Sequence, residues 1–162
     1  MSKFFRPNLI LNSVTEITPA LLREHGLRFL LLDVDCTLKR YRDTLLPESS
    51  LRWIESLQQA NIGLCLLSNG KKHRIQQVAE QTALPYVAAA MKPLPFGIRT
   101  AISSLGFDKA ATGIAGDQIF ADILAGRWAK IFTIYVAPIH PEEEHWYTRI
   151  KRPLEKRLLP HF

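Results

Sequence analysis

Short apolar runs separated by segments with helical spacing set the pattern of this chain. The runs cover residues 28–32, 62–67, 111–115 and 131–136, and a briefer apolar piece lies at 86–89. Strands that are covered on both faces of a parallel sheet are continuous apolar runs of this length, rather than alternating ones. The pattern therefore predicts about five strands.

The intervening segments have the spacing of amphipathic helices. Leu51, Ile54 and Leu57 recur on one face of a segment that Pro47 opens. Further helices are expected around residues 75–79, 96–105 and 119–124, and at 18–26, where Thr18 suits the N-cap, Pro19 the first turn and Gly26 the C-terminus. Alternating strands and helices imply right-handed crossovers and a parallel sheet with helices on both faces, which is an α/β fold.

Polar side chains stand where the apolar runs end. Asp33 and Asp35 follow the run at 28–32. An exposed turn would explain such a pair, whereas carboxylates at a buried strand end must be paired, metal-bound or catalytic. The later strands are followed by Ser68, Asn69, Lys92, Asp117 and Asp122. Because ligands of such folds bind beyond the carboxyl ends of the strands, we expect these residues to converge on one site.

The chemistry of these residues suits a phosphate. Carboxylates at two strand ends form the oxygen-rich site that Mg²⁺ prefers, and Mg²⁺ accepts further ligands from a substrate phosphate. The hydroxyls of Thr37 and Ser68 and the charge of Lys92 are suited to hold that phosphate. A neutralised Asp can act as a nucleophile, and a second carboxylate two residues along can protonate the leaving group and activate water.

In chain order, these residues resemble the four motifs of the haloacid dehalogenase (HAD) superfamily of phosphatases. The motifs are DVDCTL at 33–38, SN at 68–69, KP at 92–93 and GDQIFAD at 116–122. The resemblance implies a Rossmannoid HAD-like domain with Asp33 as nucleophile and Asp35 as general acid and base. It also implies Mg²⁺ held by Asp33, the backbone carbonyl of Asp35 and Asp117, with Asp122 in support. The phosphate ligands that it implies are Thr37, Ser68, Asn69 and Lys92.

The chain also resembles the YqeG-like group of HAD subfamily IIIA, which includes phosphatidylglycerophosphate phosphatases of mitochondria and plastids. The shared landmarks are RPNL at 6–9, SNGK at 68–71, MKP at 91–93, GDQ at 116–118 and IYVAPI at 134–139. This resemblance implies hydrolysis of phosphatidylglycerophosphate to phosphatidylglycerol. Other readings remain open: a soluble sugar phosphate or a nucleic-acid 3′-phosphate as substrate, or a non-catalytic protein that docks on RNA or a membrane.

The length of 162 residues predicts one domain over 1–162, with a core at about 28–136 and a basic tail at about 140–162. The segments between Asp35 and Ser68 and between Asn69 and Lys92 are too short for a large cap domain. Cys36 stands where HAD proteins most often have Gly. We expect it to be a packed thiol rather than a nucleophile, and two cysteines in all favour a reducing compartment.

The formal net charge of +6 predicts anionic partners, although charge alone does not choose among phosphorylated metabolites, nucleic acid and acidic membranes. Phosphatidylglycerophosphate is itself an anionic phospholipid, and no nucleic-acid motif accompanies the charge. The N-terminus lacks the apolar core of a signal peptide, and no apolar run approaches the roughly 20 residues of a membrane span. We therefore expect a cytoplasmic protein, with peripheral membrane contact through basic clusters.

Those clusters are expected on the surface, two of them beside the site and one in the tail. They are Lys39, Arg40 and Arg42; Lys71, Lys72 and Arg74; and Arg149, Lys151, Arg152, Lys156 and Arg157. The tail pattern of Trp146, Ile150, Leu154 and Leu158 is typical either of an interfacial helix or of a helix that covers the sheet. The three tryptophans, Trp53, Trp128 and Trp146, are expected to be packing anchors.

Overall fold

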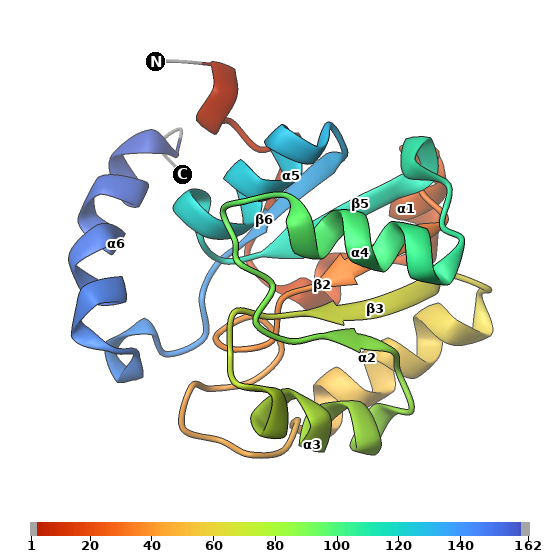
Figure 1. The fold of residues 1–162 in the computed structure, drawn as a ribbon, viewed down its shortest axis with the longest axis horizontal. Helices are drawn as coiled ribbons and strands as arrows, with labels where there is room; N and C mark the ends of the chain where they lie inside the picture. The colour runs from red at the N-terminus through yellow and green to blue at the C-terminus, as the bar shows by residue number, and fades with distance from the viewer. Residues whose placement is uncertain (1–2, 160–162) are drawn as a thin grey trace.

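One sheet of six parallel strands lies at the centre of the computed structural model, which describes residues 3–159 (Figure 1). The strand order across the sheet is β1 (Leu9–Leu11), β6 (Phe132–Val136), β5 (Thr112–Gly116), β2 (Phe29–Leu32), β3 (Gly63–Leu67) and β4 (Tyr86–Val87). The prediction of about five strands missed one strand, β1. That strand has three residues, and in the described part of the chain it pairs with β6 alone, at the edge of the sheet, so the apolar run is too short to predict a strand.

Helices cover both faces of the sheet, as predicted. The helices α1 (Pro19–Glu24), α2 (Glu48–Gln59) and α3 (Lys72–Thr82) lie on one face, and α4 (Phe96–Leu105) and α5 (Leu124–Ala129) lie on the other. Side chains of β2 alternate between the two cores: Leu30 and Leu32 pack with the first group of helices, and Leu31 packs with the second. This double burial explains why the strands are continuous apolar runs.

A sixth helix, α6 (Trp146–Leu158), lies apart from these layers, beyond the edge at which the strands end (Figure 1). The helical segment expected at 119–124 is a π-helical turn, η4 (Ile119–Ile123), which continues into α5. Short 3₁₀ turns lie at Lys3–Phe5, Val14–Glu16, Lys109–Ala111 and Pro141–Glu143. None of the helices within residues 3–159 is both long enough and apolar enough to cross a bilayer.

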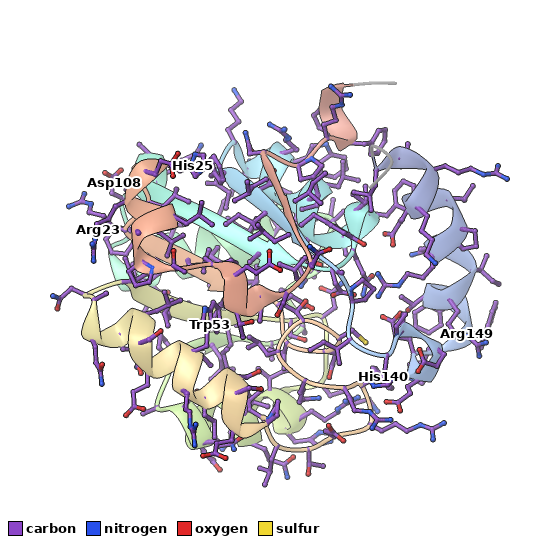
Figure 2. The ribbon with its side chains drawn as sticks, turned by 180° about the vertical axis from the view of Figure 1, so that it is seen from behind. Arg23, His25, Trp53, Asp108, His140 and Arg149 are labelled. Carbon is purple, nitrogen blue, oxygen red and sulfur yellow. The ribbon has the colours of Figure 1, made fainter. Side chains whose placement is uncertain are left out.

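The N-terminal segment belongs to the main core, which therefore begins before the expected boundary near residue 28. Val14, Ile17 and Leu22 are buried in the cluster that covers the first face of the sheet. Trp53 on α2 is also buried there, and its indole N–H donates to the carbonyl oxygen of Ile17 at 2.8 Å (Figure 2). Trp53 is thus a packing anchor, as expected. Trp146 is 71% exposed, so the same expectation was wrong for it.

We expect Thr18→Ala to lower the free energy of unfolding by about 1 kcal/mol. The Oγ1 of Thr18 accepts the backbone N–H of Leu21 at 3.1 Å and so caps α1, and alanine cannot do this. Urea denaturation measures the change. Thr18→Ser is the matched control, because serine keeps the hydroxyl and should retain most of the stability. Equal unfolding midpoints for the alanine and serine variants would contradict the capping role.

Candidate active site

The carboxyl ends of the central strands bring the predicted residues together. Asp33 follows β2, Ser68 follows β3 and Asp117 follows β5, with each residue directly after its strand. A pocket of about 200 Å³ opens at this edge of the sheet. Of the predicted residues, those that line it are Asp33, Asp35, Ser68, Asn69 and Lys92. The other three, Thr37, Asp117 and Asp122, are buried.

The ammonium group of Lys92 joins two of the predicted motifs. Its Nζ donates to Asp33 Oδ1 and to Asp122 Oδ1, both at 2.6 Å, and to the carbonyl oxygen of Leu67 at 2.9 Å. Burial alone would lower the pKa of Lys92, but the two carboxylates outweigh burial and raise it. Lys92 therefore remains a fixed positive charge at the base of the pocket.

Asn69 fixes the position of Lys92. The Asn69 side chain accepts the Lys92 backbone N–H at 2.8 Å and donates to the Lys92 carbonyl oxygen at 2.8 Å. Both polar ends of this amide are thus bonded to the main chain of the residue that carries the charge. The sequence predicted phosphate binding by Asn69, which stays a prediction, but the pairing with Lys92 was not foreseen.

Asp122 is held close to the end of β5 by two donors and by a glycine. Its Oδ1 accepts from Lys92, and its Oδ2 accepts the backbone N–H of Gln118 at 3.1 Å. A Cβ at position 116 would lie 2.2 Å from Asp122 Cγ, so only Gly116 permits this approach. Glycine therefore occupies position 116 of the predicted motif for a steric reason.

Thr37 links the two carboxylates that are predicted metal ligands. Its Oγ1 lies 2.9 Å from Asp117 Oδ1 and 3.2 Å from Asp33 Oδ2, and the hydroxyl is buried. One hydroxyl proton can be donated to only one of these oxygens at a time. Thr37 therefore orients the carboxylates, while its predicted contact with phosphate stays a prediction. Ser68 Oγ accepts the backbone N–H of Gly70 at 3.0 Å and lies at the pocket wall.

Two cations that were expected on the surface contact Asp35 instead. Lys39 Nζ lies 2.6 Å from Asp35 Oδ1, and Arg74 Nη2 lies 3.1 Å from the same oxygen. Lys39 is 3% exposed, so the expectation of a solvated side chain was wrong for this residue. Arg74 also donates to the carbonyl oxygen of Tyr41 at 2.8 Å and lies over the Tyr41 ring. The ion pairs hold the Asp35 carboxylate at the pocket wall.

Arg152 of α6 reaches the site, although the sequence placed it in a surface cluster. It is buried, and its guanidinium forms an ion pair with the carboxylate of Asp117 and donates to the Asp117 carbonyl oxygen at 2.7 Å. It also contacts Glu144 Oε2 at 2.8 Å and Glu155 Oε2 at 3.4 Å. The expectation was wrong because Asp117 lies 35 positions away in the chain, and a solvated tail cation has the same local sequence.

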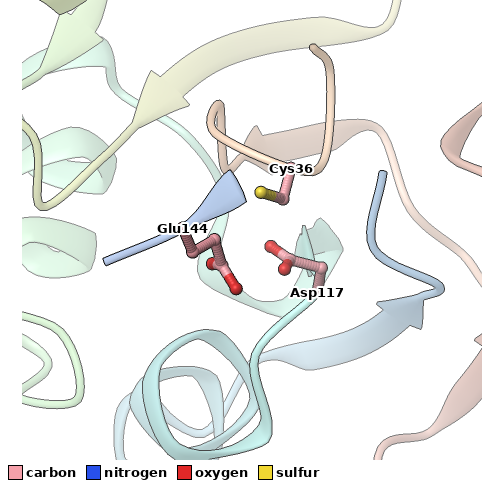
Figure 3. A group of neighbouring side chains, drawn as sticks. All are labelled: Cys36, Asp117 and Glu144. Carbon is pink, nitrogen blue, oxygen red and sulfur yellow. The ribbon is translucent and has the colours of Figure 1, made fainter. Parts of the chain in front are cut away.

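Cys36, Asp117 and Glu144 point toward one another (Figure 3), and Glu144 also lines the pocket. Cys36 has a left-handed backbone, with φ of +63°, which explains why glycine is common at this position in the HAD motif. Burial, followed by the nearby carboxylates, raises the pKa of the Cys36 thiol. The thiol is therefore uncharged at neutral pH and is a packed side chain rather than a nucleophile, as expected.

The donor set fits a divalent cation. Carboxylate oxygens of Asp33, Asp117 and Asp122 lie within 4.8 Å of one another. With Glu144 and Glu155, five buried carboxyl groups lie in one cluster and are in contact with two buried cations, Lys92 and Arg152. Burial raises the pKa of Asp33 and of Asp117, against the opposing effect of these cations. Such excess negative charge favours a hard cation with oxygen ligands.

A second hollow, of about 420 Å³, lies at the opposite ends of the strands. Asn8, His25, Leu27 and Lys130 are among the residues that line it. None of the described residues that line it carries a carboxylate, so this lining does not offer the groups that the predicted chemistry needs.

We expect Arg152→Met to lower the free energy of unfolding by about 3–5 kcal/mol in metal-free buffer, because it leaves buried carboxylates without their cation. Arg149→Met on the exposed side of the same helix is the matched control and should change stability by less than about 0.5 kcal/mol. Urea denaturation followed by circular dichroism compares the two. If Arg152→Met were no less stable than Arg149→Met, the buried ion pairs would not stabilise the fold.

Known proteins resemble this chain in sequence and in fold. It is 26% identical over 159 residues to Probable phosphatase YqeG of Bacillus subtilis (strain 168), and the match covers 98% of this chain and 92% of that protein. An uncharacterized protein from Listeria monocytogenes serotype 4b superposes with a TM-score of 0.57 at 16% identity, covering 74% of this chain and 85% of that one.

A second solved structure is the cobalt-bound deoxy-D-mannose-octulosonate 8-phosphate phosphatase (YrbI) of Haemophilus influenzae. Its TM-score is 0.50 at 16% identity, with 57% of this chain and 60% of that chain covered. These two structures bear on the fold alone. The family model for haloacid dehalogenase-like hydrolases matches residues 5–130. That match includes Asp33 and Asp117, which follow β2 and β5, and Lys92 between them. This protein therefore belongs to the haloacid dehalogenase-like hydrolase family.

Proposed function

We propose that this protein is a Mg²⁺-dependent phosphomonoesterase in which Asp33 is the nucleophile. The observation that carries the proposal is the buried cluster in which Lys92 Nζ contacts Asp33 and Asp122 at 2.6 Å, with Asp117 alongside. A phosphate in the adjacent pocket would meet a fixed positive charge, a carboxylate and the hydroxyl of Ser68. Positioning and charge stabilisation are the main requirements of phosphoryl transfer.

The reaction proceeds in two displacements. An Asp33 oxygen forms a bond to phosphorus as the bond from phosphorus to the ester oxygen breaks, and Asp35, which enters this step in its protonated form, donates its proton to the departing alcohol. Asp35 then takes a proton from water, whose oxygen bonds to phosphorus as the bond to Asp33 breaks. Inorganic phosphate is released and both aspartates return to their starting state.

Lys39 and Arg74 determine where Asp35 can act, because both contact its carboxylate. Lys92 balances negative charge on the phosphate throughout, and Asn69 holds the Lys92 main chain in place. Asp33, Asp117 and the backbone carbonyl of Asp35 would hold Mg²⁺, with Asp122 in support. Bound Mg²⁺ would neutralise charge on the carboxylates and the phosphate, so that an anionic nucleophile can approach an anionic substrate.

The proposed substrate is phosphatidylglycerophosphate, which would be hydrolysed to phosphatidylglycerol. The likeness to the YqeG-like group supports it, together with a site that has no large cap domain and can admit a bulky alcohol. Exposed cations near the pocket, including Lys71, Lys72 and Lys151, suit an anionic headgroup. Measurement of phosphate release from phosphatidylglycerophosphate in mixed micelles, beside a soluble phosphomonoester, tests the substrate. Turnover of the soluble ester alone would discard the lipid assignment.

We expect Asp33→Asn to reduce phosphate release by a factor on the order of 10³ or more, because the amide is not a competent nucleophile. Asp43→Asn, at an exposed carboxylate in the following loop, is the control and should keep full activity. Both variants should show the circular dichroism spectrum of the wild type. Substantial turnover by a folded Asp33→Asn protein would exclude the mechanism.

Mg²⁺ should raise the melting temperature of the wild type, because a cation that binds only the folded protein stabilises it. At roughly 100 times its dissociation constant the gain is about 2.7 kcal/mol. Asp117→Asn should lose most of this shift and Asp43→Asn should keep it. Chelation by EDTA should also stop phosphate release, and added Mg²⁺ should restore it. A melting temperature that does not respond to Mg²⁺ would argue against the metal site.

A further inference from the structure

The polarity of α6 is reversed relative to a helix that packs on a core. Its buried face carries the charged side chains of Arg152 and Glu155, which are bonded to Asp117 and to the backbone N–H of Phe120. Its outer face carries Trp146, Ile150 and Leu154, which are 71%, 62% and 53% exposed. These three residues are spaced by four positions, so they form one stripe along the helix.

Cations flank this apolar stripe. The exposed cationic side chains of α6 are Arg149, Lys151, Lys156 and Arg157. An apolar stripe bordered by Lys and Arg is the pattern of helices that lie in the interface of a bilayer. A second copy of this chain would bring like charges together on that face, whereas an anionic lipid surface would be attracted by them.

Aromatic rings connect the stripe to the mouth of the active site. The ring centroids of Tyr41 and His145 lie 5.2 Å apart, and the His145 ring stacks on that of Tyr147 with their centroids 5.4 Å apart. The ring centroids of Tyr147 and Trp146 lie 6.2 Å apart. Tyr41, His145 and Tyr147 line the pocket itself. Tyr and Trp are suited to the boundary between an apolar layer and water, because each has an apolar body and a polar group.

From these observations we infer that the outer face of α6 docks the protein on an anionic bilayer, with the active-site mouth at the edge of the contact. Because Arg152 and Glu155 fix the inner face of α6 to the residues after β5, docking would orient the pocket relative to the lipid headgroups. The inference of a docking surface depends on the residues of α6 and not on the proposed substrate. Its link to lipid turnover rests on the proposed function.

Co-sedimentation with vesicles tests the inference on the full chain, without substrate. Vesicles of phosphatidylglycerol and phosphatidylcholine should bind the wild type, whereas pure phosphatidylcholine should bind it far less, and salt should weaken the binding. Replacement of all three stripe residues (Trp146→Ser, Ile150→Ser, Leu154→Ser) should weaken binding by roughly ten-fold or more. Leu45→Ser, at an exposed leucine outside α6, is the matched control and should bind as the wild type does.

Charge reversal gives a second, independent test. Arg149 on α6 and Arg23 on α1 are both exposed and lie on opposite sides of the molecule (Figure 2). Arg149→Glu should weaken binding to anionic vesicles several-fold, and Arg23→Glu should have a smaller effect. Turnover of a soluble phosphomonoester by these variants should match the wild type, since neither residue lines the pocket.

Two results would overturn the inference. One is a wild type that does not bind anionic vesicles, or a triple variant that binds them equally well. The other is a dimer, found by sedimentation velocity, that the triple variant dissociates, because the stripe would then be covered by a second copy. Vesicle binding through α6 without turnover of phosphatidylglycerophosphate would refute the proposed substrate but not the docking surface. Turnover without binding would refute the docking surface alone.

Discussion

The concentration of negative charge at the carboxyl ends of the central strands constrains much of this structure. Carboxylates cannot be buried there without compensating groups, because desolvation disfavours their charged form. Lys92 supplies one such group and is itself held by Asn69. Arg152 supplies another from a helix far along the chain. The arrangement leaves more buried carboxyl groups than cations in contact with them, and this excess favours the binding of a divalent cation.

The same charge explains why α6 is placed where it is. The inner face of α6 presents Arg152 and Glu155, which contact acidic and backbone groups beyond β5. Near the C-terminal end of the helix, Leu158 packs against the small apolar cluster of Ile119, Ile123 and Tyr135. Trp146, Ile150 and Leu154 are left on the outer side. The inner face of α6 thus contacts the acidic site, while its outer face carries the proposed membrane contact. Substitutions on the inner face test stability and metal binding, and substitutions on the outer face test docking.

Much of the fold could be predicted from the sequence, because burial on both faces requires continuous apolar strands and helices must alternate with them. The convergence of the predicted residues could be expected because parallel strands end at one edge, while the chemical roles assigned to them stay predictions. What escaped prediction depended on partners distant in sequence. Strand β1 is recognised only by its pairing with β6, and Lys39 and Arg152 resemble solvated cations until the fold supplies Asp35 and Asp117. Asn69 similarly gains its role from the loop that carries Lys92.

The most direct test of the mechanism is to trap the covalent intermediate. Borohydride reduces an acyl phosphate, so enzyme quenched during turnover and then reduced should contain homoserine in place of one aspartate, which peptide mass spectrometry can locate. We predict homoserine at Asp33, formed only when substrate and Mg²⁺ are both present. Its absence under turnover conditions, or its appearance at another carboxyl group such as Asp35, would contradict the assignment of Asp33 as the nucleophile.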